Sequence, residues 1–149
     1  MAKFYYRMQN ILDIKTKLEE SAKQEYSEAR RILNEEENRL KQLEARKMEY
    51  LHAYQQAITG KLVFEDIQEN SNAVDIMDEY IARQNEVVKR CSKELERERQ
   101  KLNQLMQERK MHEKLKEKKF DEFVQELNAA ENKETDEIVS YLYNDAKEE

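Results

Sequence analysis

Residues 58–61 read ITGK, and Gly60 within them is the only glycine of the chain. The chain contains no proline, so Gly60 is the one strong turn signal in 149 residues. Glycine commonly ends a helix by adopting the left-handed conformation, which residues with a Cβ rarely tolerate. We therefore predict that one helix ends here, that Gly60 is left-handed, and that a second helix begins shortly afterwards.

The composition on both sides of Gly60 is typical of long helices. Charged residues make up 40% of the chain and hydrophobic residues 38%. The dominant residue types, among them Leu, Glu, Lys and Gln, lose little on entering a helix. A bundle of four or five helices would need more turn residues than the sequence supplies. A disordered chain can have a similar composition, but its apolar residues would not be periodic.

Apolar residues follow alternating three- and four-residue steps on each side of Gly60, the heptad spacing of a coiled-coil seam. Charged residues interrupt the first seam at Lys15, Glu19, Glu36 and Lys47. A slip of the heptad frame interrupts the second seam before Phe120, and such a stutter locally unwinds a supercoil. The first seam consists of Leu12, Ala22, Tyr26, Ala29, Leu33, Leu40, Leu43, Tyr50, Tyr54 and Ala57. The second consists of Ile67, Val74, Met77, Ile81, Val88, Cys91, Leu95, Leu102 and Leu105, and resumes as Phe120, Phe123, Leu127, Ala130, Ile138 and Tyr141.

The two seams predict an all-α fold, a long antiparallel two-helix coiled-coil hairpin with a longer C-terminal helix. A fold at Gly60 pairs residue i with about residue 122 minus i, which places Phe4 beside Phe120. Two chains paired intermolecularly would satisfy the same seams, but the single turn signal favours a monomeric hairpin. We expect a single domain, residues 1–149, with helix one over about residues 3–58, a turn at about 59–64, helix two over about 65–143 and an acidic C-terminal tail.

No sequence pattern favours an enzyme. The chain lacks a glycine-rich phosphate loop, paired cysteines and an HExxH motif. His52 and His112 fall on different helices and far apart along the hairpin, which excludes a shared metal ion. Cys91 falls at a seam position, where a small core residue fits better than a reactive thiol. We predict no catalytic residue, no metal and no cofactor. The lone cysteine and the lack of a signal peptide or membrane span predict a cytoplasmic protein.

Charge is segregated into blocks along the chain. Residues 1–17 contain four bases and one acid, and residues 109–119 contain six bases and two acids. The hairpin brings these two segments together as a positive collar at its open end. Residues 64–80 contain six acids and no base, and residues 120–149 contain ten acids and two bases. Single surface charges are usually only solvated, but this segregation favours a docking role. The net charge of −6 disfavours nucleic acid as the partner.

Two stretches resemble the FliJ family, the small soluble component of the bacterial flagellar export apparatus. They are FYYRMQNILDIKTKLEESAKQEY, residues 4–26, and ERKMHEKLKEKKFDEFVQELNAAENKETDEIVSYLY, residues 108–143. The start R-x-Q-x-x-L-x-x-K occurs together with a basic run in the C-terminal half. Similar residues occur in the family at Arg7, Gln9, Leu12, Lys15, Leu18, Glu19, Arg109, Glu113, Lys114, Lys118, Lys119, Glu131 and Asp136.

The resemblance implies a non-enzymatic protein similar to the stalk subunit of rotary ATPases. Its expected partners are the hexameric flagellar export ATPase, the cytoplasmic domain of the export gate protein FlhA, and export chaperones. It would couple ATP hydrolysis to substrate export from a position peripheral to the membrane, without inserting into it. Two alternatives stay open: a generic cytoplasmic coiled-coil adaptor or tether, and the stalk of a rotary ATP synthase or V-type ATPase.

Two docking surfaces follow from the charge blocks and the resemblance together. We expect the tyrosines near the turn to dock, because large rings fit poorly into a two-helix seam. The predicted ATPase-docking residues are Phe4, Tyr5, Arg7, Gln9, Leu12, Lys15, Arg109, Lys114, Lys118 and Lys119. The predicted gate-docking residues are Leu43, Lys47, Tyr50, Tyr54, Asn70, Val74, Met77 and Ile81.

Overall fold

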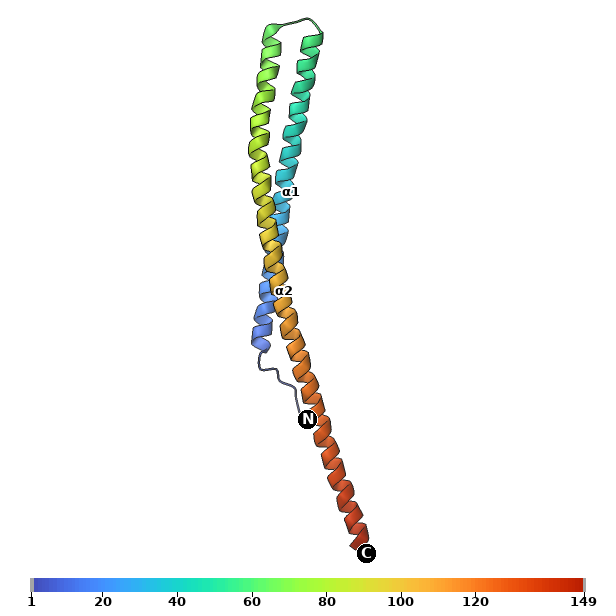
Figure 1. Cartoon of the computed structure of the whole chain (residues 1–149). Coiled ribbons are helices and arrows are strands. Elements are labelled where there is room, and N and C mark those ends of the chain that lie inside the picture. The colour runs from blue at the N-terminus through green and yellow to red at the C-terminus, as the bar shows by residue number, and fades with distance from the viewer. Residues whose placement is uncertain (1, 149) are drawn as a thin grey trace. The chain divides into compact units, whose positions relative to one another are not determined.

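The computed structural model describes residues 2–148 and contains two long helices that pack against each other (Figure 1). Helix α1 spans Gln9–Thr59 and helix α2 spans Phe64–Glu148. No strand occurs within the described range. Ion pairs between the helices show that they are antiparallel, because Lys15 pairs with Glu108 whereas Lys47 pairs with Asp78. The predicted all-α helical hairpin with a longer C-terminal helix is confirmed.

The chain divides into two compact units. One unit, Glu20–Asn103, contains the turn. The other combines residues 2–19 with residues 104–148. The behaviour of the two units as a single domain stays a prediction.

The turn lies at residues 60–63, in the place that the sequence predicts, but Gly60 is not left-handed. Its N–H donates to the carbonyl oxygen of Gln56 at 3.0 Å, so Gly60 completes the last helical hydrogen bond of α1. Thr59 also bonds back to the helix, since its hydroxyl donates to the carbonyl oxygen of Gln55 at 2.9 Å. The expected left-handed cap is therefore wrong: the helical hydrogen bonds continue through Gly60, and the chain reverses after it.

Helix α1 begins at Gln9, and not at residue 3 as the sequence predicts. Aromatic residues have only moderate helix propensity, and here the side chain of Phe4 packs on α2 instead. The Phe4 ring lies 5.3 Å from the Phe120 ring and 5.6 Å from the Phe123 ring, measured between centroids. The helical path starts only where the N–H of Gln9 donates to the carbonyl oxygen of Tyr6. Residues 2–8 are called the N-terminal segment below.

The seam between the helices continues through the polar positions that interrupt the apolar pattern. The most buried apolar side chains of the seam are Leu12, Ala22, Ala29 and Met77, and Tyr6 of the N-terminal segment is also buried. Two of these are alanines, and small side chains let neighbouring helices approach closely. The four charged positions of the first seam are also at least half-buried: Lys15, Glu19, Glu36 and Lys47.

Helix α2 continues to Glu148, whereas the sequence predicts an end at about residue 143 followed by a tail. Ala146, Lys147 and Glu148 are good helix formers, and Lys147 in the last turn complements the negative end of the helix dipole. Beyond Leu127 the side chains of α2 are exposed, as far as residue 147. Figure 1 shows this end of the helix running on past the start of α1.

Candidate docking surfaces

Two of the predicted collar cations form ion pairs between α1 and α2. Lys15 Nζ donates to a carboxylate oxygen of Glu108 at 2.9 Å, and this contact lowers the pKa of Glu108. Arg109 reaches across to Glu19, whose side chain is only 3% exposed, and it also pairs with Glu113 on its own helix. Hydrogen bonding to Glu19 raises the pKa of Arg109. Lys15 and Arg109 therefore join α1 to α2 in this unit.

Three of the predicted apolar or polar collar residues also make contacts within the chain. Leu12 is buried, and Phe4 packs against Phe120 and Phe123. Gln9 donates a hydrogen bond to Asp13, one turn further along α1, at 2.9 Å. The predicted neighbourhood of Phe4 and Phe120 is thus present. Its effect is to hold the N-terminal segment on α2.

The remaining collar residues form the exposed part of this end. Tyr5 is 81% exposed, although it stands between half-buried Phe4 and buried Tyr6. Arg7, Lys114 and Lys118 are exposed and have no ion pair among the described residues. Lys119 has a long contact of 3.4 Å with Glu122. Tyr5 and these cations are called the exposed collar below.

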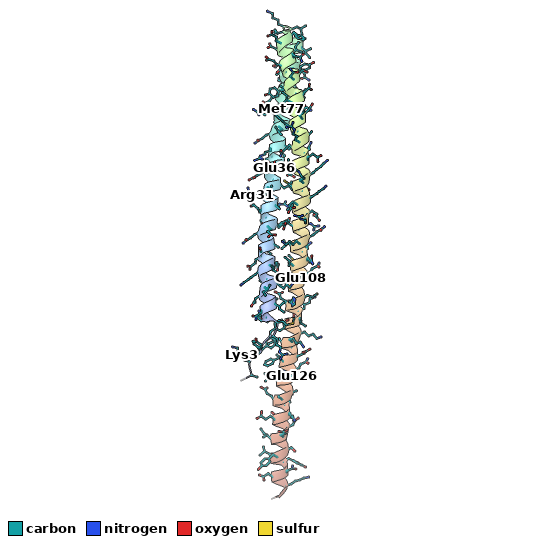
Figure 2. The ribbon with its side chains drawn as sticks, turned by 90° about the vertical axis from the view of Figure 1, so that its left-hand side faces the viewer. Lys3, Arg31, Glu36, Met77, Glu108 and Glu126 are labelled. Carbon is teal, nitrogen blue, oxygen red and sulfur yellow. The ribbon has the colours of Figure 1, made fainter. Side chains whose placement is uncertain are left out.

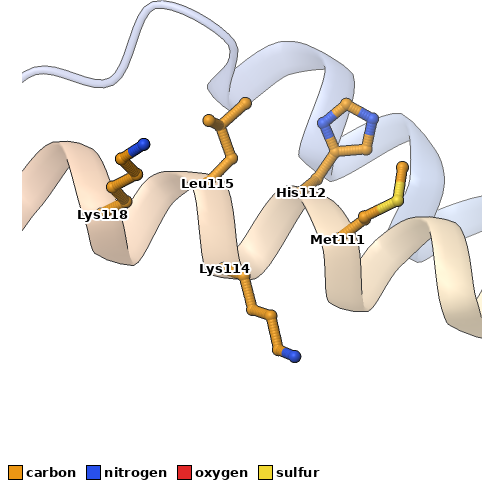
Figure 3. Close-up of a pocket in the computed structure, with 5 residues that line it drawn as sticks. All are labelled: Met111, His112, Lys114, Leu115 and Lys118. Atoms are coloured by element: carbon orange, nitrogen blue, oxygen red, sulfur yellow. The ribbon is translucent and has the colours of Figure 1, made fainter.

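Residues of the exposed collar line two grooves. The first lies on α2 and is lined by Met111, His112, Lys114, Leu115 and Lys118 (Figure 3). Lys114 points to the opposite side of α2 from His112 and Leu115. The second groove lies between the N-terminal segment and α2, and two of its lining residues, Lys3 and Glu126, are labelled in Figure 2. Its lining includes Lys3, Phe4, Tyr5, Arg7, Leu115, Lys119, Phe123 and Glu126. The lining of each groove therefore includes both apolar side chains and lysines.

The predicted gate-docking residues lie along the seam of the other unit. Met77 is 7% exposed, and Lys47 pairs with Asp78 at 2.6 Å. The remaining members are half-buried: Leu43, Tyr50, Tyr54, Asn70, Val74 and Ile81. The structure brings them together along the two helices near the turn, but as residues of the interface between the helices. Their role in docking stays a prediction.

The exposed apolar residues of this unit lie elsewhere, and the sequence analysis missed them. Leu62 is 69% exposed and Phe64 is 77% exposed, on either side of Val63. Leu62 lies in the turn between the helices and Phe64 is the first residue of α2, where Glu65 and Asp66 follow in the first helical turn. The signal was available, because an LVF run that begins two residues after the chain's only glycine lies outside both heptad seams. This segment, residues 62–64, is called the apolar tip.

A second exposed apolar cluster lies near the C-terminal end of α2. Its members were treated in part as seam residues, although α1 does not extend alongside this part of α2. The exposed side chains are Ile138, Val139, Tyr141, Leu142 and Tyr143. They are surrounded by the acidic block of residues 120–149. The sequence supplied the apolar spacing, but not the absence of a partner helix.

The described residues contain no group of three or more metal-ligating side chains that could hold a metal ion. The His52 ring lies 3.1 Å from the Gln56 side chain on its own helix, and Cys91 is half-buried in the seam. In the same described range, neither helix has an apolar stretch long enough to cross a membrane. The fold thus places the chain in the class of long helical hairpins, with grooves and exposed apolar segments on its surface.

The comparisons with known proteins identify the family. The family model "Flagellar FliJ protein" matches residues 4–148, so the chain belongs to the FliJ family. This is a family of non-enzymatic components of flagellar type III export. A solved structure, that of a putative YscO homologue from Chlamydia trachomatis, has the same fold with a TM-score of 0.63. It is 22% identical and covers 99% of both chains. Comparison with curated proteins gave no match.

Family membership decides between the alternatives that the sequence left open. A family match over nearly the whole chain is not expected for a generic coiled-coil adaptor with shared composition alone. The same match disfavours a stalk subunit of an ATP synthase. The chain is therefore a component of flagellar type III export.

Proposed function

We propose that the chain is a non-enzymatic coupling component that binds the hexameric export ATPase at one end of the hairpin and the export gate near the turn. The observation that supports ATPase docking most directly is the exposed collar. Lys114 and Lys118 are free of ion pairs among the described residues, and both are among the lining residues of the groove that contains Leu115. Cations at the edge of a groove accelerate encounter with an acidic partner surface, and apolar contacts supply most of the affinity.

The structure narrows the residues that we assign to this contact. Lys15 and Arg109 are excluded from the primary docking set, because their charges are used in ion pairs between the helices. Phe4 and Leu12 pack within the hairpin and are assigned a structural role, because Phe4 contacts two rings of α2 and Leu12 is buried. The proposed contact residues are Tyr5, Arg7, Lys114, Lys118 and Lys119, together with the exposed parts of Met111 and Leu115.

A charge-reversal experiment tests the ATPase contact. Lys114→Glu/Lys118→Glu should leave the circular dichroism spectrum unchanged, because Glu and Lys are both good helix formers. Stimulation of the purified ATPase should fall, and the loss should be largest at low salt, where screening is weakest. The matched control is Arg90→Glu/Lys93→Glu, which makes the same charge change at exposed positions of α2 in the other unit. Equal stimulation by both double variants across a salt titration would refute the assignment.

For the export gate, we propose a surface around the turn that includes the apolar tip. Leu62 and Phe64 are exposed, whereas Tyr50 and Tyr54 are half-buried in the seam. The acidic first turn of α2, with Glu65 and Asp66, adds charge beside the apolar side chains. Exposed apolar groups surrounded by charge are typical of docking surfaces. The partly exposed edges of the two tyrosines would extend this surface along the hairpin.

Two variants separate docking from packing near the turn. Leu62→Ser/Phe64→Ser should weaken binding to the cytoplasmic domain of the gate while leaving the thermal midpoint unchanged, because both side chains are exposed. Met77→Ala should lower the thermal midpoint, because Met77 is buried in the seam. Binding measured by calorimetry that is unaffected by the double serine variant would place the gate contact elsewhere.

A further inference from the structure

Glu98 differs from the other polar residues of the seam in the partner that it meets. Lys15 meets Glu108, Glu19 meets Arg109, and Lys47 meets Asp78, so each of these charges faces the opposite charge. The half-buried carboxyl group of Glu98 instead meets that of Glu25 on α1. The two residues line the same groove between the helices.

One oxygen of the Glu98 carboxyl group needs a donor. Its Oε2 atom is buried and has no hydrogen-bond partner among the described residues. Glu25 already accepts a hydrogen bond from Lys101 Nζ at 2.9 Å. A buried, charged oxygen without a donor is costly, whereas a protonated carboxyl group can donate to its neighbour. The geometry of the pair therefore favours a proton between the two carboxyl groups.

The other charges around this pair are mostly engaged with one another. On α1, Glu28 is bonded to Arg31. On α2, Glu94 lines the same groove and pairs with Arg97 at 2.9 Å. Lys101 is the cation that the structure joins directly to the pair. One ammonium group thus faces two carboxyl groups, and the trio has one excess negative charge when both are ionised.

We propose that Glu25 and Glu98 bind one proton between them. The contact between α1 and α2 at this position of the hairpin is therefore more stable when that proton is bound, and its stability depends on pH. The proton comes from solvent and resides on Glu98, whose O–H donates to the Glu25 carboxylate. Lys101 keeps its hydrogen bond to Glu25. Proton uptake brings the net charge of the trio from −1 to zero. The inference concerns the Glu20–Asn103 unit and does not rest on the proposed partners.

The sign of the effect follows from the direction of the two pKa shifts. Burial, followed by the hydrogen bond and charge of Glu25, raises the pKa of Glu98. The Lys101 ammonium group lowers the pKa of Glu25. An acid whose pKa is raised in the folded state contributes stability that is complete below its ordinary pKa and is lost as the pH rises through the raised value. Mild acidification should therefore stabilise the contact between α1 and α2 at this position, before the other carboxylates are protonated.

A carboxyl NMR titration of the whole chain tests the shared proton. The ¹³C shift of the Glu98 carboxyl group should titrate at higher pH than that of Glu69, an exposed glutamate on the same helix and in the same unit. Glu25→Gln should move the Glu98 midpoint down towards that of Glu69, because the neighbouring negative charge is removed. Equal midpoints for Glu98 and Glu69 in the unmodified chain would overturn the proposal.

Thermal unfolding followed over a range of pH gives an independent measurement. Glu98→Gln mimics the protonated side chain, so it should raise the thermal midpoint at neutral pH and flatten its change between neutrality and about pH 5. The control Glu69→Gln should keep the pH profile of the unmodified chain. A Glu98→Gln profile parallel to that of the control would also overturn the proposal.

Discussion

The N-terminal segment supplies the sharpest test of the structure, because Phe4 and Tyr5 are adjacent aromatic residues with opposite environments. Phe4→Ala removes two ring contacts, with Phe120 and with Phe123. Each aromatic pair of this geometry contributes about 0.5–1.5 kcal/mol, so the loss should be about 1–3 kcal/mol. Tyr5 is 81% exposed, and Tyr5→Ala should cost less than about 0.5 kcal/mol.

Amide hydrogen exchange can locate this difference. The reporters are the N–H of Gln9, which donates to Tyr6, and the N–H of Leu12, which donates to Met8. These bonds form where the N-terminal segment joins α1. A local loss of about 2 kcal/mol should accelerate their exchange about 30-fold in Phe4→Ala. Tyr5→Ala should change it about twofold or less.

The same two variants separate support from docking. Tyr5→Ala should weaken ATPase binding with little change in exchange, because the proposed contact is lost while the segment stays in place. Phe4→Ala should affect both measurements. Exchange at Gln9 and Leu12 that is equally fast in the two variants would refute the packing of Phe4 on α2. Exchange unchanged from the parent chain in Phe4→Ala would refute it as well.

Three further predictions follow from single contacts. Gly60→Ala should preserve the hairpin and change stability by less than about 1 kcal/mol. The reason is that φ at Gly60 is not positive and that the added Cβ lies 3.2 Å from the backbone oxygen of Gln56. A loss of helicity or a dimer in solution would contradict this. Arg109→Leu should lower the thermal midpoint, because the buried Glu19 carboxylate loses its contact with the Arg109 guanidinium group. Adding Glu19→Leu should restore most of the lost stability. A double variant as unstable as the single variant would contradict this prediction. Lys15→Met should reduce the loss of stability on acidification, because Lys15 lowers the pKa of Glu108. The stability that this ion pair contributes is present above the ordinary pKa of the carboxyl group and disappears as the pH falls through the lowered value. Unchanged acid denaturation would show that the pair has no effect.

The fold could be predicted from the sequence because the relevant information is local and periodic. Heptad spacing before and after Gly60 is sufficient to predict two helices and the place where they reverse. The conformation of Gly60 could not be predicted in this way, since a glycine after a helix can end it with either a left-handed or a helical geometry. The late start of α1 was also missed, because helix propensity does not include the tertiary contacts of Phe4 with Phe120 and Phe123.

The candidate docking surfaces were harder to predict, because the sequence shows which residues are charged but not which charges are already paired. Lys15 and Lys118 are equally basic in the sequence, yet the structure pairs Lys15 with Glu108 and leaves Lys118 exposed. Similarly, Tyr54 and Phe64 are both large aromatic residues near the turn. The heptad position of Tyr54 carries it into the seam, whereas Phe64 lies outside both seams and is exposed.

The polar residues of the seam explain how two weakly apolar helices keep one alignment. Four polar positions of α1 have partners on α2, and each pair lies within a single unit. Two are ion pairs in the unit that contains the chain ends, and two more contacts occur in the unit that contains the turn. In the latter, the Gln84 amide donates to both the backbone carbonyl and the carboxylate of Glu36, at 2.9 and 2.6 Å. The partners are Lys15 with Glu108, Glu19 with Arg109, Glu36 with Gln84, and Lys47 with Asp78.

A slip of one heptad would keep the apolar spacing but lose most of these contacts. With α2 moved by seven residues in one direction, Lys15 would face Lys101 and Glu19 would face Leu102. In the same slip, Glu36 would face Met77 and Lys47 would face Ser71, so no ion pair would survive. In the other direction Lys15 would face Leu115, Glu19 would face Lys116, Glu36 would face Cys91, and Lys47 would face Asn85.

That second slip therefore retains one complementary pair of the four. A buried charge without a partner costs far more than a correct surface pair contributes. The polar seam thus penalises each wrong alignment at several positions, while an all-leucine seam would tolerate both. The polar seam residues therefore favour one alignment of α1 on α2, at the expense of some stability.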